Sequence, residues 1–270
     1  MYKNNIKSIA IGSFDGIHLG HKALIEQVEA VVIIERNGGY LTPGYKRSWY
    51  IEKPCFFYHF EHIFRLSAKE FIEKLENDFP KLETIVVGYD FEFGYKKEGS
   101  VELIQDLFRG SVHIIDEVKK DNLSVHSRVI KSYLQQRSIE EVNRLLGRNF
   151  RINGNVVVGQ GLGKKELVPT INLNVYDYKL PKNGVYATRT EVNGEWFNSI
   201  SFLGHRVTTD NHFAVETHIL NRDIGEVNGE VVVEFVASIR ENRKFDSLEA
   251  LKAQIVLDMI CANNILKQKD

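Results

Sequence analysis

Cysteine is scarce in this sequence of 270 residues, which contains Cys55 and Cys261 and no third example. The two lie far apart and form neither a CxxC pair nor another metal-binding spacing, which is typical of ordinary thiols in a reducing compartment. No run of about 18 apolar residues occurs, and the N-terminal MYKNNIKSIA lacks a long apolar core. These absences argue against a membrane span and a signal peptide, and we expect a cytoplasmic protein with no membrane partner.

An excess of one charge is also missing, because 35 Lys and Arg residues are balanced by 36 Asp and Glu residues. A net charge of −1 argues against a nucleic acid partner, so a phosphate ligand must be held by local groups in a compact site. The sequence is 43% hydrophobic and 26% charged, which is the balance of a globular protein, and it is long enough for two domains. These features do not indicate an oligomeric state.

The first half of the chain alternates short β-rich runs with helical patterns. The strand runs are SIAIG, AVVIIE, TIVVGYD and SVHIID, and the helical runs are HKALIEQVEA, SAKEFIEKLEN, VELIQDLF and SIEEVNRLLG. This alternation predicts a parallel α/β layer of Rossmann type. The pattern ends near residues 147–152, so we predict a first domain over residues 1–150.

From Ile152 onward the sequence has strand after strand: NGNVVVG, TINLNV, GVYATRTEV, EWFNSISFLG, AVETHIL and GEVVVEFVASI. The pair Asn193 and Gly194 predicts a hairpin turn between two of these strands. We therefore predict a small antiparallel barrel over residues 151–270. It is closed by a helix, SLEALKAQIVLDMICANNIL, for which Asp246 is the predicted N-cap with Glu249 at capping-box spacing.

The stretch GSFDGIHLGH, residues 12–21, carries the chemistry of the first domain. A strand that ends at Gly12, a tight turn and a helix that begins near Gly20 would direct backbone N–H groups toward one phosphate. His18 and His21 would lie at the same helix entrance, where imidazole donors could stabilise charge on a transferred phosphorus. The spacing is neither GxGxxG nor a Walker loop. Two alternatives stay open: half-buried helix-start histidines, and a zinc pair that lacks a third ligand.

GSFDGIHLGH closely resembles the GxFDGxHxGH signature of the nucleotidyltransferase superfamily, in the form found in bacterial bifunctional riboflavin kinase/FMN adenylyltransferases. Residues 152–262 resemble the riboflavin kinase module of the same family, because GNVVVGQGLGKKELVPTINLNV, LPKNGVYATRTEVNGEW, AVETHIL and IRENRKFDSLEALKAQIVLD follow in the family's order. The resemblance implies phosphorylation of riboflavin to FMN by ATP in the second domain. It also implies adenylylation of FMN to FAD, with release of pyrophosphate, in the first.

For the kinase, the resemblance implies roles for three groups of residues. Thr170 and Asn172 of VPTINL are two apart, hence on one face of a strand, and correspond to family residues that contact Mg²⁺ and nucleotide phosphates. Glu216 of AVETHIL corresponds to the base that takes the proton of the riboflavin 5′-hydroxyl. The expected ATP-side loop comprises Gly159, Gly161, Gly163 and Lys164. Without the resemblance, these would be a strand start, a solvated glutamate and a glycine turn.

For adenylyl transfer, the resemblance implies nucleotide binding by Gly12, Phe14, Asp15, Gly16, Gly20, Ser127, Arg128 and Lys131. VHSRVIK represents the family's SSTxIR, with His126 in place of the first Ser, and Lys131 keeps the charge of Arg without its bidentate fork. In VVGYDFEFGYKKEG, the residues Asp90, Phe91 and Phe93 are expected to border the nucleotide or flavin pocket, and packing of a strand end onto the sheet is the alternative.

The first domain departs from the family after AVVIIE, where RNGGYLTPGYKRSW replaces the TFxPHP segment and the domain is roughly 30 residues shorter. Three interpretations follow. The favoured one is a bifunctional enzyme that uses ATP, Mg²⁺ and flavin substrates. The second is a riboflavin kinase whose first domain binds nucleotide but has weak or no FAD synthetase activity. The third is a flavin or nucleotide sensor, which Glu216, Thr170 and Asn172 argue against.

Overall fold

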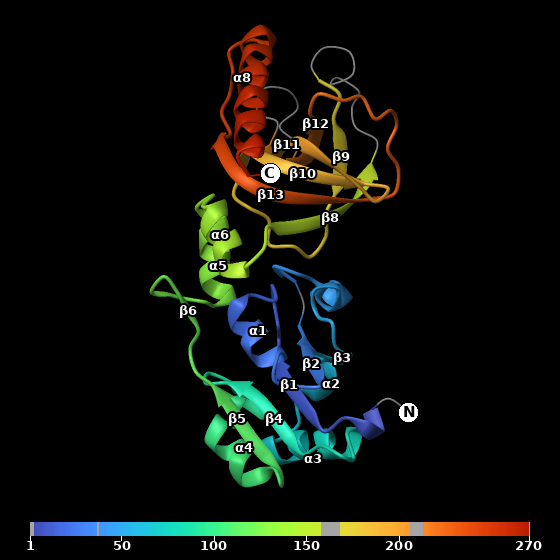
Figure 1. Ribbon diagram of the computed structural model, residues 1–270, viewed down its shortest axis with the longest axis vertical. Helices are drawn as coiled ribbons and strands as arrows, with labels where there is room; N and C mark the ends of the chain where they lie inside the picture. The colour runs from blue at the N-terminus through green and yellow to red at the C-terminus, as the bar shows by residue number, and fades with distance from the viewer. Residues whose placement is uncertain (1–2, 37, 158–167, 206–212, 270) are drawn as a thin grey trace. The chain divides into compact units, whose positions relative to one another are not determined.

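The computed structural model describes residues 3–36, 38–157, 168–205 and 213–269. It divides into two compact units, Met1–Ser127 and Arg128–Asp270 (Figure 1). The division comes before α6 (Ile139–Leu146), because this helix packs against two strands of the second unit, β8 (Phe150–Val157) and β13 (Glu230–Glu241). The change of sequence period near residue 150 follows that helix. We keep the bounds 1–150 and 151–270 as a proposal for the extent of the two catalytic modules.

The first unit contains a five-stranded parallel sheet in the order β3-β2-β1-β4-β5. The strands are β1 (Ser8–Gly12), β2 (Ala30–Glu35), β3 (Cys55–His59), β4 (Thr84–Gly88) and β5 (Ser111–Ile115). The expected Rossmann-like layer is therefore confirmed. Four of the strands match the predicted runs, whereas β3, with the sequence CFFYH, was not predicted. The chain direction around β1 places its carboxyl end beside those of β2 and β4, where ligands bind in such sheets.

Helices cover both faces of this sheet (Figure 1). They are α1 (Leu19–Ile25), α2 (Phe60–Ile63), α3 (Ala68–Asp78) and α4 (Val101–Leu107), with 3-10 turns at Lys3–Asn5, Gly44–Tyr50 and Tyr95–Lys97. Successive residues of β1 serve two different cores, since Ile9 and Ile11 pack with Phe71 of α3 while Ala10 packs with Leu24 of α1. A small hairpin, β6 (Lys119–Lys120) and β7 (Leu123–Ser124), precedes α5 (Ser127–Gln135).

The second unit contains a closed antiparallel barrel in the order β10-β11-β12-β9-β8-β13, as predicted. Its strands are β8 (Phe150–Val157), β9 (Ile171–Asn174), β10 (Gly184–Val192), β11 (Glu195–His205), β12 (Phe213–Ile219) and β13 (Glu230–Glu241). The hairpin turn at Asn193 and Gly194 is confirmed: both have positive φ, 53° and 84°, and Val192 pairs with Glu195. Positive φ at both central residues is what a tight hairpin needs.

Helix α8 (Leu248–Lys267) lies along β10, β11 and β13 (Figure 1). Its predicted N-cap, Asp246, is wrong: the cap is Ser247, whose hydroxyl accepts the N–H of Ala250 at 3.1 Å. Asp258 anchors the helix to the barrel through Arg240, with Arg240 Nη2 2.7 Å from Asp258 Oδ2 and Arg240 Nε 2.9 Å from both carboxylate oxygens.

The barrel interior holds five buried hydroxyls in a closed ring of hydrogen bonds, which we call the hydroxyl ring. Thr188 lies 2.8 Å from both Ser199 and Ser201, and Thr190 lies 2.7 Å from Ser199. Thr217 closes the ring, at 3.1 Å from Thr190 and 3.0 Å from Ser201. Each hydroxyl can donate one bond and accept one, so the ring satisfies itself without water. It joins β10 and β11 to β12.

Candidate active site

The loop between β1 and α1 places His18 at the helix entrance, as the sequence predicts. His18 is the N-cap of α1 and is 4% exposed, and its Nδ1 accepts the backbone N–H of His21 at 3.2 Å. An imidazole whose Nδ1 is an acceptor carries its proton on Nε2, so Nε2 is a hydrogen-bond donor. A capping histidine thus presents to the site the donor that phosphate binding requires.

The two imidazoles of the signature are stacked on each other. The rings of His18 and His21 are 3.5 Å apart with an interplanar angle of 17°, and His21 meets the edge of Phe14 at 5.2 Å. A Cβ at Gly20 would lie 3.2 Å from the His18 ring and 3.2 Å from the carbonyl oxygen of Val125. Glycine at position 20 therefore permits this stacking. Gly16 has a φ of 91°, which explains the glycine that follows Asp15.

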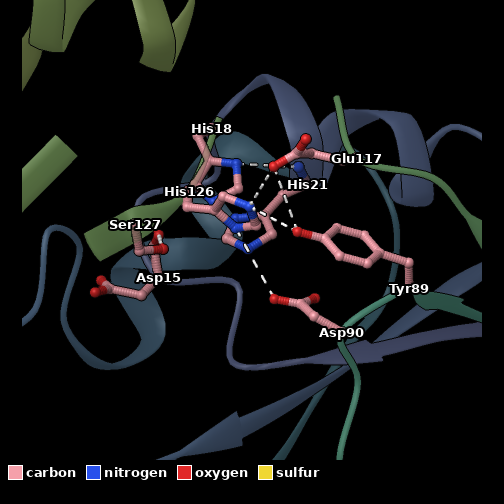
Figure 2. A network of polar contacts seen from close by, with 8 residues as sticks. All are labelled: Asp15, His18, His21, Tyr89, Asp90, Glu117, His126 and Ser127. Atoms are coloured by element: carbon pink, nitrogen blue, oxygen red, sulfur yellow. Dashed lines mark hydrogen bonds and ion pairs between the residues drawn. The ribbon is translucent and has the colours of Figure 1, made fainter. Parts of the chain in front are cut away.

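Asp15 is buried and holds protein groups. Its Oδ1 accepts the N–H groups of Leu41 at 2.7 Å and Thr42 at 3.2 Å, and its carbonyl oxygen accepts the Ser127 hydroxyl at 2.7 Å. These contacts join the loop between β1 and α1 to the segment that contains Leu41 and Thr42 and to the start of α5. Figure 2 shows Asp15 beside Ser127. Sequence reasoning missed this bracing role, because the partners lie 26, 27 and 112 residues away.

A polar network that the sequence analysis did not predict lies beside this loop (Figure 2). His126 Nε2 is 3.0 Å from the Tyr89 hydroxyl and 3.4 Å from Glu117 Oε1, and His126 Nδ1 is 3.9 Å from Asp90 Oδ2. The pKa of Glu117 is lowered to about 2, chiefly by a hydrogen bond from Ser124 and further by Lys119 and His126. The network therefore places a charged carboxylate on one side of the His126 imidazole.

The other residues predicted for this domain are placed as follows. Gly12 ends β1, Asp90 is exposed in the turn after β4, Ser127 begins α5, Arg128 is exposed and Lys131 is half-buried one helical turn after Ser127. Phe93 is buried in the core and Phe91 stacks on it at 5.7 Å. Both rings therefore pack onto the sheet, as the alternative interpretation of this segment expects. Their flavin contacts remain a prediction.

In the barrel, strand pairing brings the predicted kinase residues together. Glu216 of β12 is the register partner of Asn172 of β9, and both are half-buried. Register partners project from the same face of a sheet, so the carboxylate and the amide share one surface. Thr217, the next residue, points into the hydroxyl ring, as the predicted alternation requires. Thr170 directly precedes β9, and Gly159, Gly161, Gly163 and Lys164 lie outside the described residues.

His218 lies beside the predicted kinase residues, and the sequence analysis did not select it. It lies two positions beyond Glu216 on β12, and its Nδ1 is 2.7 Å from the carbonyl oxygen of Pro169. A carbonyl only accepts, so His218 donates and fixes the start of the Thr170–Asn172 segment. The signal was present in AVETHIL, since period-two alternation places Glu216 and His218 on one face.

The donor groups present bear on metal binding. Among the described residues, no group of three or more His, Cys, Asp or Glu side chains is arranged to hold a metal ion. The hydroxyl and amide oxygens of Thr170 and Asn172 suit Mg²⁺, which is usually held by few protein oxygens together with substrate phosphates and water. None of the described helices is both long and apolar enough to cross a membrane.

Comparison with known proteins covers both units. The riboflavin kinase family model matches residues 146–266, and the FAD synthetase model matches residues 2–36 and 50–129. Proteins named bifunctional riboflavin kinase/FMN adenylyltransferase from Pseudomonas fluorescens and Listeria monocytogenes are 28% and 29% identical, over 93% of this chain and 90% of theirs. A crystal structure described as a macrolide-efflux protein from Streptococcus pneumoniae, 24% identical, matches with a TM-score of 0.83 over 97% of this chain and 95% of its own, and shows the fold alone. The chain belongs to the family of bifunctional riboflavin kinase/FMN adenylyltransferases.

Proposed function

We propose that this protein makes flavin cofactors in two steps: its barrel phosphorylates riboflavin to FMN with ATP, and its α/β domain adenylylates FMN to FAD. The observation that carries the proposal is the pairing of Glu216 with Asn172, two motif residues from separate segments, on one face of a barrel matched by the riboflavin kinase family. We place the enzyme in the cytoplasm, because two cysteines without pairing spacing fit a reducing compartment.

In the kinase step, Glu216 accepts the proton of the riboflavin 5′-hydroxyl as that oxygen attacks the γ-phosphorus of ATP and ADP leaves. Asn172, beside it, and Thr170 supply the oxygens that would hold Mg²⁺ and orient the phosphates, and the bound ion would neutralise phosphate charge. His218 keeps this segment in place through Pro169. Base and nucleotide ligands thus lie on neighbouring strands, so the acceptor oxygen and the γ-phosphate can be brought within attack distance.

In the adenylylation step, a phosphate oxygen of FMN attacks the α-phosphorus of ATP and pyrophosphate leaves. His18 donates from Nε2 toward the phosphate oxygens, where negative charge grows in the transition state. The stacked His21 ring and the N-cap bond fix the direction of that donor. Ser127, Arg128 and Lys131 at the start of α5 are the proposed further nucleotide contacts.

Product analysis with riboflavin and MgATP, resolving FMN from FAD, tests the proposal. Glu216→Gln should lower FMN formation by about a hundredfold or more, the usual cost of losing a general base. The same variant should still convert supplied FMN to FAD. The double variant His18→Ala with His21→Ala should lose FAD formation from FMN, while its FMN formation from riboflavin should stay near wild type. Loss of both activities to the same degree in a folded protein would contradict two separate sites.

One observation favours the second candidate, a riboflavin kinase whose first domain binds nucleotide but transfers adenylyl groups weakly. The FAD synthetase match omits residues 37–49, the stretch that stands where the family has TFxPHP. Conversion of supplied FMN decides between the two: FAD formation as fast as FMN formation favours the efficient bifunctional enzyme. Absence of FAD, with ATP still bound by the first domain, favours the kinase alone.

A further inference from the structure

The segment from Tyr40 to Tyr50, which we call the Arg47 segment, is built differently from the family pattern. It begins inside the stretch 37–49 that the FAD synthetase match omits, and it forms a 3-10 helix at Gly44–Tyr50. The segment connects β2 to β3, so it leaves the sheet at the carboxyl edge, where the signature loop also lies. Most of the segment therefore lies outside the family match, and it adjoins the proposed adenylylation site through Asp15.

Arg47 is the centre of this segment and is fully buried. Its Nε donates to the carbonyl oxygen of Thr42 at 2.9 Å, and its guanidinium lies 4.4 Å from the ring centroid of Tyr40. Nη1 is 3.9 Å from Glu35 Oε1 at the end of β2, too far for a hydrogen bond. Arg47 thus holds the segment together through one hydrogen bond and one ring contact, and it links the segment to the sheet through one ion pair with Glu35.

Through Thr42 this link reaches the signature loop. The carbonyl of Thr42 accepts from Arg47, and the N–H of the same residue donates to Asp15 Oδ1 at 3.2 Å, next to the Leu41 N–H at 2.7 Å. The Asp15 carbonyl in turn accepts the Ser127 hydroxyl. A continuous path of hydrogen bonds therefore runs from Arg47 through Thr42 and Asp15 to Ser127 at the start of α5. Ser127 belongs to the VHSRVIK motif, which is expected to bind nucleotide.

Stability alone does not account for a buried arginine in this position. Among the described residues, neither Nη1 nor Nη2 of Arg47 has a hydrogen-bond partner, although both are buried. Burying a charge with so few partners is costly, because the lost hydration of the guanidinium is replaced by one hydrogen bond and one long ion pair. The gain that offsets this cost is a fixed geometry for the backbone that Asp15 holds.

We propose that Arg47 is a positioning residue for adenylyl transfer. It holds Asp15, and with it the loop between β1 and α1 that carries His18, in the reactive arrangement. In this role the Arg47 segment takes the place of the family's TFxPHP segment. The inference rests on the proposed function of the first domain. It makes a specific demand: removing the guanidinium should slow FAD formation by protein that is still folded at the assay temperature. A purely structural arginine would instead lower stability and leave the FAD rate of the folded protein unchanged.

The test compares full-length Arg47→Met and Arg47→Lys with Arg36→Met, which removes an exposed arginine just after the same strand. Conversion of FMN to FAD, FMN formation from riboflavin and the melting temperature are measured for each. In Arg47→Met, kcat for FAD should fall at least about tenfold, since small misplacements near reacting groups have such effects. Arg47→Met should stay folded at the assay temperature with FMN formation unchanged, Arg36→Met should behave as wild type, and Arg47→Lys should recover part of the rate.

Hydrogen exchange supplies a readout that does not depend on activity. Arg47→Met should speed exchange in peptides that cover residues 13–21 and 40–42, whereas Arg36→Met should not. Unchanged exchange there, or wild-type FAD formation by Arg47→Met, would overturn the positioning role while the proposed function stands. A fall in melting temperature that accounts for the rate loss would also overturn it. Wild-type protein that makes FMN but no FAD would instead refute adenylyl transfer itself.

Discussion

The hydroxyl ring inside the barrel leads to a prediction about additivity. The ring is five hydroxyls joined by five bonds, so every proton has an acceptor. Replacing Thr188 by Val, which has the same shape, leaves four hydroxyls with three bonds between them. The Ile200 carbonyl lies 3.5 Å from the Thr217 hydroxyl, too far for a full O–H···O hydrogen bond. One buried proton therefore lacks a good acceptor, which costs about 1–3 kcal/mol in the free energy of unfolding. Ser199→Ala leaves the same deficit for the same reason.

Pairs of substitutions distinguish a closed ring from independent bonds. Thr188 and Ser199 are neighbours in the ring, and removing both leaves three hydroxyls with two bonds, so still one proton lacks an acceptor. The double variant should therefore cost about 1–3 kcal/mol less than the sum of the single variants. Thr188 and Thr217 are not neighbours, and removing both leaves two such protons. That pair should be additive and serves as the matched control.

Urea unfolding followed by tryptophan fluorescence measures these energies. The chain has two tryptophans, so a Trp49→Phe background makes Trp196 of β11 the reporter for the barrel. FMN formation checks that each variant retains the native site, since the ring residue Thr217 adjoins Glu216 on β12. Additive costs for the neighbouring pair, or equal coupling in both pairs, would show that the hydroxyls do not act as a ring.

Three other predictions follow from single contacts. Asp258→Asn should lower the free energy of unfolding by about 3 kcal/mol, because it leaves the charge of Arg240 without its partner under α8, and urea unfolding measures this loss. His218→Ala should lower kcat/KM for MgATP in FMN formation by about two- to tenfold, the value of one hydrogen bond, with FAD formation from FMN unchanged. The pKa of Glu117, ordinarily 4.5, is held at about 2 chiefly by Ser124, so its stabilising contribution is present above pH 4.5 and disappears as the pH falls through 2. Melting temperatures across that range should fall less steeply in Glu117→Gln than in wild type, and equal slopes would contradict the assignment.

Local patterns in the sequence were enough to predict both architectures. Period-two runs identified the barrel strands. The alternation of strand and helix identified the parallel sheet, whose central strands read as continuous apolar runs because helices cover both faces. The hairpin at Asn193 and Gly194 was predictable because positive φ is a property of those residue types. Cap choice was less certain: Asp246 and Ser247 are both good caps, and the course of the chain before α8 selected Ser247.

Only the tertiary structure decided which distant groups meet. The pairing of Glu216 with Asn172 depends on the register of two barrel strands, which closure of the whole barrel sets. The bracing of Asp15 depends on backbone N–H groups of Leu41 and Thr42, which carry no sequence signature of their own. The burial of Arg47 could not be predicted either, because arginine side chains are expected at the protein surface and nothing local in the sequence marks this one as buried. The sequence by itself determined the chemistry that this protein can perform, and the packing of remote segments determined where that chemistry is assembled.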